Sequence, residues 1–226
     1  AEPGKTTAII GSTGCGKSTL INLIPRFYDV SAGRITLDGI DIRKISQHKL
    51  RDLIGLVPQK GILFSGTIAS NIKLAGEDRI SDGMMRDAAQ VAQAEEFITA
   101  KTEGYDSPVA QGGTNVSGGQ KQRLAIARAI AKDPRIYLFD DSFSALDYKT
   151  DAQLRRALNR KAASATVLIV AQRISTILHA DQILVLDEGK IVGKGTHAQL
   201  LESCPQYQEI ARSQLSESEL KGGIAG

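Results

Sequence analysis

Short runs of apolar and β-branched residues alternate along the chain with stretches of helical periodicity. Apart from Arg135, the runs at residues 6–10, 135–139 and 166–170 consist of consecutive apolar or β-branched residues, which is typical of strands buried on both faces of a parallel sheet. A helical stretch at residues 150–164 separates the last two runs. The pattern therefore predicts an α/β fold that contains a β-α-β unit.

Two pairs of short apolar runs are each separated by a turn sequence, which predicts two antiparallel hairpins. The first turn is Asp38-Gly39, a strong two-residue hairpin signal. The expected strands are residues 34–37 and 40–42 in the first hairpin and residues 182–186 and 191–195 in the second, with a further short strand at residues 54–57. An antiparallel part should therefore accompany the parallel part of the sheet.

From about residue 67 to residue 132 the periodicity is helical, which predicts a helical insertion. The tail after Cys204 is expected to form one amphipathic helix, with residues 221–226 frayed. We expect a single domain over residues 1–226, divided into an α/β core at residues 1–58 and 134–226 and a helical subdomain at residues 59–133.

The composition is that of a packed globular domain. Of the 226 residues, 42% are hydrophobic and 23% are charged, which excludes a disordered or collagen-like chain. The longest apolar run, residues 165–171, is far shorter than the ~20 residues of a membrane helix. The net charge of +3 is spread along the chain, so nucleic acid is not an expected partner. Two cysteines favour a reducing cytosolic compartment, and the start at Ala1 suggests a segment of a longer protein.

A glycine-rich motif lies between the strand at residues 6–10 and a helix expected at residues 17–24. Its residues match G-x-x-x-x-G-K-[ST], here called the P-loop: Gly11, Ser12, Thr13, Gly14, Cys15, Gly16, Lys17, Ser18 and Thr19. Glycines let backbone N–H groups converge on phosphate oxygens, Lys17 reaches the outer phosphates, and Ser18 would ligate Mg²⁺. The motif predicts binding of a nucleoside triphosphate with Mg²⁺.

Two further segments fit the same chemistry. Asp140 ends an apolar strand and, paired with the P-loop, is the natural partner of Mg²⁺, although an acid here could also cap a helix. Ser117-Gly118-Gly119-Gln120, here called the signature segment, precedes a long amphipathic helix. Ser117 stands at a capping position and the glycines allow an anion to approach, but alone such a segment is as consistent with a simple capped turn.

The order of these motifs resembles that of ATP-binding cassette (ABC) nucleotide-binding domains. The P-loop is followed by Gln59, the signature segment, Asp140 and then Ser144-Ala145-Leu146-Asp147. Leu63-Phe64-Ser65-Gly66 and Arg173-Ile174-Ser175-Thr176 are similar to the exporter branch. The resemblance implies a P-loop NTPase core with a mixed sheet, an antiparallel β part and an inserted helical subdomain.

The same resemblance implies roles and partners. Gln59 would sense Mg²⁺ and a membrane domain, and the signature segment would close on ATP held by a second nucleotide-binding domain, paired head to tail. An exporter of this kind would use Mg-ATP to drive transport, with the domain at the cytoplasmic face of the membrane and a fused or associated transmembrane domain.

Two positions depart from the family pattern. The family places Glu after the Mg²⁺-linked aspartate, as the base that polarises water, and this chain has Asp141. The family's switch histidine is replaced by Gln172, which can donate a hydrogen bond but cannot titrate. Paired losses of this kind resemble the degenerate half of a heterodimeric exporter, and the uncharged segment at residues 108–113 fits that interpretation.

The sequence leaves three functions open. The leading hypothesis is an ATPase domain that contributes the slow ATP site, with Asp141, Gln172 and Gln59 as its catalytic residues. One alternative is a clamp that binds ATP without hydrolysing it, and another is an ordinary ATPase subunit of a homodimer. Kinases and GTPases share the P-loop but lack the signature segment.

Overall fold

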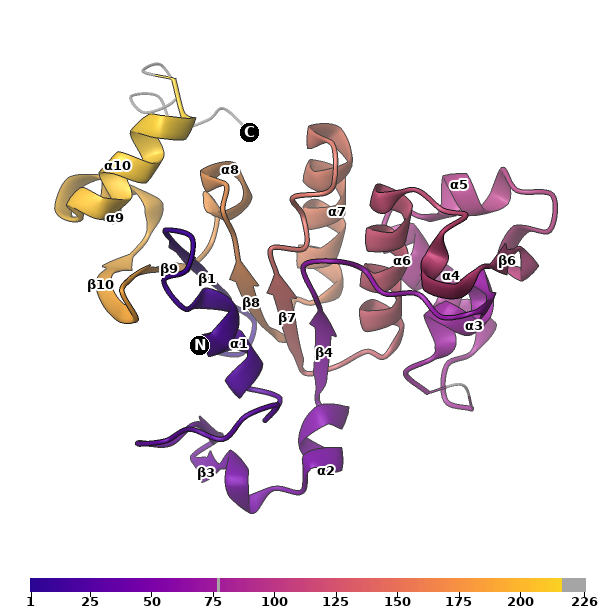
Figure 1. Cartoon of the computed structure of the whole chain (residues 1–226), viewed down its shortest axis with the longest axis horizontal. Helices are drawn as coiled ribbons and strands as arrows, with labels where there is room; N and C mark the ends of the chain where they lie inside the picture. The colour runs from indigo at the N-terminus through magenta and orange to yellow at the C-terminus, as the bar shows by residue number, and fades with distance from the viewer. Residues whose placement is uncertain (77, 217–226) are drawn as a thin grey trace.

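The computed structural model describes residues 1–76 and 78–216, with a six-stranded sheet at its centre (Figure 1). The strands lie in the order β10-β9-β1-β8-β7-β4; β10 is antiparallel to β9, and the other neighbours are parallel. Their bounds are β1 Thr6–Gly11, β4 Ile54–Val57, β7 Ile136–Asp140, β8 Thr166–Val170, β9 Gln182–Asp187 and β10 Lys190–Gly195. The mixed α/β fold is confirmed.

Helices cover both faces of this sheet because consecutive residues of β1 point to opposite sides. Ala8 and Ile10 belong to one hydrophobic cluster with Leu154, which lies on α7 (Tyr148–Lys161). Ile9 belongs to a second cluster with Ile21, which lies on α1 (Lys17–Leu23). Burial on both faces explains why the central strands lack polar alternation.

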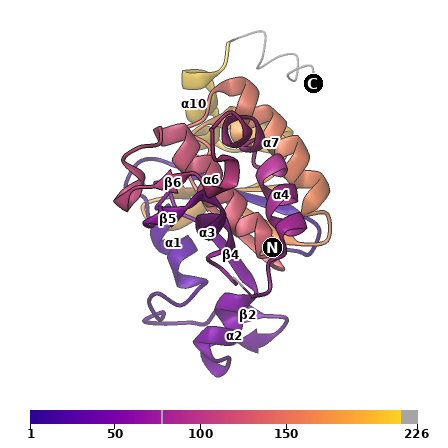
Figure 2. The same cartoon turned by 90° about the vertical axis from the view of Figure 1, so that its right-hand side faces the viewer.

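The helical segment lies at one end of the sheet, beyond β4 (Figures 1 and 2). It contains α3 Ile68–Lys73, α4 Asp82–Val91, α5 Glu95–Thr99 and α6 Gly118–Ala131, with the short strands β5 Gly66–Thr67 and β6 Pro108–Val109 and the 3₁₀ turns η2 Gly104–Asp106 and η3 Gln111–Gly113. α6 packs against α3, α4 and also β4. One hydrophobic cluster therefore runs from Ala88 through Ile126 to Phe139, and the boundaries at residues 58 and 133 stay a prediction.

The first hairpin differs from the expectation that it accompanies the parallel sheet. β2 (Thr36–Leu37) and β3 (Ile40–Asp41) pair antiparallel through the Asp38-Gly39 turn but form a separate two-stranded sheet. The second strand ends early because the Asp41 carboxylate accepts a hydrogen bond from the Arg43 N–H and starts the 3₁₀ turn η1 (Ile42–Lys44). α2 (Gln47–Asp52) then leads into β4.

Three more helices complete the described chain: α8 Ile174–Ile177, α9 His197–Ser203 and α10 Pro205–Gln214. The helix expected after Cys204 is α10, whereas the hydrophobic pattern did not indicate α9. Thr196 and Gln199 cap α9 reciprocally, and Pro205 opens α10 at its first turn, so two short helices stand in series. The expected fraying at residues 221–226 lies outside the described residues.

Candidate functional site

The P-loop connects β1 to α1 and needs glycine for two separate reasons. A Cβ on Gly11 would lie 2.0 Å from the carbonyl oxygen of Leu186 on β9, so only glycine fits there. Gly16 precedes α1 with φ at 99°, a left-handed conformation that glycine adopts without strain. As the N-cap, Gly16 has no side chain to bond the first-turn N–H groups of α1. The loop therefore offers backbone donors at the end of a central strand.

Lys17 lies folded back over the P-loop. Its side chain is buried, and Nζ donates hydrogen bonds to the carbonyl oxygens of Gly11 at 2.8 Å and Ser12 at 2.7 Å. Nζ also lies 3.6 Å from the Cys15 sulfur. The loop thus holds the ammonium group in place through neutral carbonyl oxygens.

Ser18 and Asp140 meet across 122 residues of sequence. The Ser18 hydroxyl donates to Asp140 Oδ1 at 3.0 Å, at the carboxyl end of β7. Burial raises the pKa of the Asp140 carboxyl above its ordinary value, and the Ser18 hydrogen bond and the charge of Lys17 oppose that rise. A hydroxyl and a carboxylate side by side are oxygen donors of the kind that Mg²⁺ prefers.

The donor set also fits the way in which Mg²⁺ is held beside phosphates. No group of three or more His, Cys, Asp or Glu side chains able to hold a metal occurs within residues 1–76 and 78–216. Mg²⁺ commonly takes only one or two protein ligands and completes its shell with waters and substrate phosphates. The pair of Ser18 and Asp140 is sufficient for that arrangement.

Asp141 is hydrogen-bonded to both predicted glutamines, Gln59 and Gln172. Its Oδ2 accepts a hydrogen bond from Gln59 Nε2 at 3.2 Å and another from Gln172 Nε2 at 2.9 Å. The residue is 7% exposed and its backbone has φ at 48°, while its N–H donates to the Val170 carbonyl oxygen. The three predicted catalytic residues therefore form one hydrogen-bonded group, with both amides directed at a single carboxylate oxygen.

One cavity of about 260 Å³ joins these groups. Its lining comprises Thr13, Gly14, Gly16, Lys17, Ser18, Thr19, Gln59, Asp140, Asp141, Val170 and Gln172. The signature segment contributes nothing to this lining. In Figure 1, α1 and α6 lie on either side of β7 and β4. Most of the sequence-predicted residues thus fall into two groups, one around the cavity and one at the start of α6, while Gly11, Ser12 and Cys15 of the P-loop do not line the cavity.

The start of α6 has the capped form that the sequence indicates. The Ser117 hydroxyl accepts a hydrogen bond from the Gln120 N–H, and the Gln120 side chain accepts one from the Ser117 N–H. Ser117 and Gly118 are exposed. This reciprocal cap fixes the helix start while its two glycines leave the backbone open to solvent.

Gln122 is a positioning residue that the sequence reasoning missed. It is 1% exposed on α6, accepts a hydrogen bond from the Gly61 N–H at 2.8 Å and donates one to the Pro58 carbonyl oxygen at 3.1 Å. These two bonds hold the loop that carries Gln59. The available signal was a polar residue on a helix face otherwise filled by apolar side chains.

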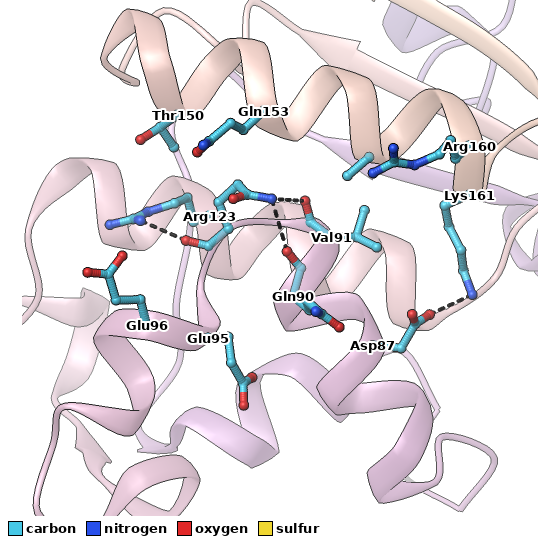
Figure 3. Close-up of a pocket in the computed structure, with 12 residues that line it drawn as sticks. Asp87, Gln90, Val91, Glu95, Glu96, Arg123, Thr150, Gln153, Arg160 and Lys161 are labelled. Atoms are coloured by element: carbon cyan, nitrogen blue, oxygen red, sulfur yellow. Dashed lines mark hydrogen bonds and ion pairs between the residues drawn. The ribbon is translucent and has the colours of Figure 1, made fainter.

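A larger cavity of about 820 Å³ lies between α4, α5, α6 and α7 (Figure 3). Lys161 and Asp87 form an ion pair of 2.7 Å, and Arg123 donates to the Gln93 carbonyl oxygen (Figure 3). None of the sequence-predicted site residues lines it. Size alone does not locate the chemistry, because the smaller cavity holds the lysine, the serine and the aspartates.

The parallel sheet, the P-loop between β1 and α1, and an aspartate at the end of β7 beside the P-loop serine define a P-loop nucleotide-binding domain. The chain belongs to the ABC transporter family, whose model matches residues 1–144. Its similarity to a lipid A-core flippase and to a solved exporter structure makes it a nucleotide-binding domain of the exporter type.

Individual relatives support this assignment. An uncharacterized ABC transporter ATP-binding protein of Mycobacterium bovis is 52% identical over 99% of this chain and 38% of its own length. An ATP-dependent lipid A-core flippase of Saccharophagus degradans is 45% identical over 95% of this chain and 36% of its own length. The solved structure of a bacterial Atm1-family ABC exporter with ATP bound superposes with a TM-score of 0.91 at 42% identity. That match covers 95% of this chain and 38% of the exporter chain, so this chain spans well under half the length of each of these relatives.

Proposed function

We propose that the chain binds Mg-ATP at the P-loop cavity. Lys17 and the loop N–H groups would hold the phosphates, and Ser18 and Asp140 would hold Mg²⁺, with Gln59 close by. The observation that carries this proposal is the single cavity that brings the P-loop together with Asp140, Asp141 and two glutamines from separate loops. The similarity to an exporter with ATP bound supports it.

The remainder of the proposed function concerns partners. An exposed, capped signature segment lies outside the chain's own cavity, and such a segment is suited to closing on ATP held by a second nucleotide-binding domain. We infer a head-to-tail pair of these domains beneath a transmembrane domain, at the cytoplasmic face of a membrane. In that pair, ATP hydrolysis would drive export.

The chain's own site is proposed to be the slow one of two unlike sites. Asp141 is one methylene shorter than the family's glutamate, and its Oδ2 already accepts hydrogen bonds from two amides. A displacement near 1 Å can reduce a rate on the order of a hundredfold. Gln172 cannot carry the positive charge that a histidine could supply. A non-identical partner would then provide the faster site.

The same two hydrogen bonds favour a second candidate, a clamp that holds ATP without turnover. Single-turnover phosphate release at this chain's own site, measured in the full-length transporter, separates the two. Slow release that disappears with Lys17→Ala supports the ATPase, and Mg-ATP binding with no release at this site supports the clamp.

Removing the Lys17 charge tests nucleotide binding directly. Lys17→Ala should weaken Mg-ATP binding by at least tenfold, because a charge-assisted hydrogen bond contributes about 1.5 to 3 kcal/mol. The measurement is a titration of a fluorescent ATP analogue against both proteins. Lys5→Ala, at an exposed lysine paired with Glu2, is the control and should leave affinity unchanged. Equal affinity in the wild type and Lys17→Ala would refute the proposed site.

A further inference from the structure

We propose that Gln214, on the C-terminal helix α10, is a positioning residue that holds Gln172 in the site. Its side-chain amide spans the segment that follows β8. Gln214 Oε1 accepts a hydrogen bond from the Ile174 N–H at 2.8 Å, and Gln214 Nε2 donates one to the Gln172 carbonyl oxygen at 2.8 Å. This inference rests on the proposed function, because it assigns a role within the same ATP site.

The two hydrogen bonds supply what α8 lacks locally. α8 begins at Ile174, and its N-cap, Arg173, makes no side-chain capping bond. The first N–H groups of a helix need a partner from outside the helix. Gln214 provides one from 40 residues away and bonds the preceding carbonyl at the same time. One amide therefore fixes both ends of the Gln172-Arg173-Ile174 backbone.

The anchor for this amide is a well-packed helix. Tyr207 and Ala211 of α10 are 0% exposed and belong to the main hydrophobic cluster, and the Tyr207 hydroxyl lies 2.8 Å from His197 Nδ1 on α9. Gln214 itself is exposed at the end of the helix. Its substitution therefore removes the two hydrogen bonds without opening the core.

The Gln214 contact affects the proposed ATP site because Gln172 also contacts Asp141. The Gln172 side chain donates to Asp141 Oδ2 at 2.9 Å, while its backbone is held by Gln214. Releasing the backbone would let this side chain leave Asp141, because Gln214 is the α10 residue that bonds the Gln172 main chain. Gln214 thus couples the docking of the C-terminal helix to the geometry at Asp141.

The same helix offers a matched control. Gln208 Nε2 donates to the Leu201 carbonyl oxygen of α9 at 2.8 Å, so Gln208→Leu loses a side-chain bond of the same length that joins α10 to α9 and not to the segment after β8. Gln214→Leu keeps the size of the side chain and loses both bonds to the segment after β8. Differences between the two variants report the contact with that segment and not the docking of α10 in general.

The experiment uses the full-length transporter with its partner and follows phosphate release in single-turnover and steady-state modes. Gln214→Leu should raise the hydrolysis rate at this site on the order of tenfold with KM for ATP unchanged, because it frees Asp141 Oδ2 from the Gln172 amide, while Gln208→Leu stays at the wild-type rate. In a Gln172→Ala background, Gln214→Leu should have no further effect, since the side chain it positions is gone. Hydrogen exchange at the Ile174 amide should be faster in Gln214→Leu alone.

Several outcomes would overturn the assignment. These are an equal rise in the rate of Gln208→Leu, an unchanged or lowered rate in Gln214→Leu, a full further rise in the Gln172→Ala background, a change confined to KM, or unchanged hydrogen exchange at the Ile174 amide. Failure of the proposed function is recognised separately. If the wild-type protein does not bind Mg-ATP, the proposed function fails, but exchange at the Ile174 amide would still be faster in Gln214→Leu than in the wild type if Gln214 holds the segment.

Discussion

At the scale of single residues, Asp141 differs from the pattern of the ABC family. It follows the proposed Mg²⁺ partner Asp140, adopts a left-handed backbone conformation and accepts hydrogen bonds from Gln59 and Gln172 on one oxygen. A carboxylate in that position can orient water only if an oxygen is available and close enough. The short side chain and the two amides both act against this, which is the physical basis on which we propose a slow site.

Restoring the family pattern should raise turnover. The double variant Asp141→Glu with Gln172→His extends the carboxylate and adds a titratable donor, and each effect can contribute about ten- to a thousandfold. We expect an increase within that range for single-turnover hydrolysis at this site in the assembled transporter. Asp141→Asn serves as the control without a base. An unchanged rate in the double variant would place the limit in the partner's signature segment instead.

These residue-scale features divide into those that sequence can predict and those that it cannot. The P-loop motif and the aspartate ending an apolar run predicted the meeting of Ser18 with Asp140, because parallel strands end at one edge of the sheet. The sharing of one Asp141 oxygen by Gln59 and Gln172 depends on three separate loops, and no local pattern encodes it.

At the scale of elements, α6 links the signature segment to the loop of Gln59. Its first residue follows the Ser117 cap, and one turn further Gln122 bonds the backbone on both sides of Gln59. A movement of α6 would therefore displace the loop that carries Gln59, which lines the nucleotide cavity. The core strands were predicted closely, with β8 at Thr166–Val170 matching the expected run, because burial on both faces leaves an unbroken apolar signal.

Elements whose positions depend on tertiary context were predicted less well. α9 depends on a reciprocal cap between Thr196 and Gln199, and the first hairpin stands apart from the main sheet because η1 ends its second strand. Short elements of this kind carry too few apolar positions to give a periodic signal.

Removing the Gln122 amide should destabilise this junction. Gln122→Leu removes the side-chain partner of the half-buried Gly61 N–H, and an unpaired buried group costs about 1–3 kcal/mol of unfolding free energy. It also leaves the Pro58 carbonyl with only the longer hydrogen bond from the Ser142 hydroxyl at 3.5 Å. We expect a loss of about 2 kcal/mol in urea unfolding of this chain. Gln120→Leu on the same helix, which loses only a bond of an exposed cap, should cost about 1 kcal/mol or less. Equal losses in both variants would contradict the role given to Gln122.

At the scale of the whole molecule, the proposed pair would make the chain contribute to two different ATP sites. The cavity of the P-loop has the altered Asp141 and Gln172, whereas the signature segment is intact, exposed and turned to solvent outside that cavity. The proposed head-to-tail pair would combine this segment with the partner's P-loop. In that pair, the two ATP sites would differ: the P-loop cavity of this chain would bind one ATP, and its signature segment would act on the other.

One comparison tests this account most directly. In the full-length transporter with its partner, Ser117→Arg places a bulky cation at the start of α6 and should suppress most substrate-stimulated phosphate release, because it blocks closure over the partner's ATP. Asp141→Asn should leave most of that release intact, because Asp141 acts only in the slow site. The measurement is phosphate release from both variants at equal ATP. Loss of activity in Asp141→Asn with activity retained in Ser117→Arg would contradict the account and make this chain an ordinary catalytic subunit.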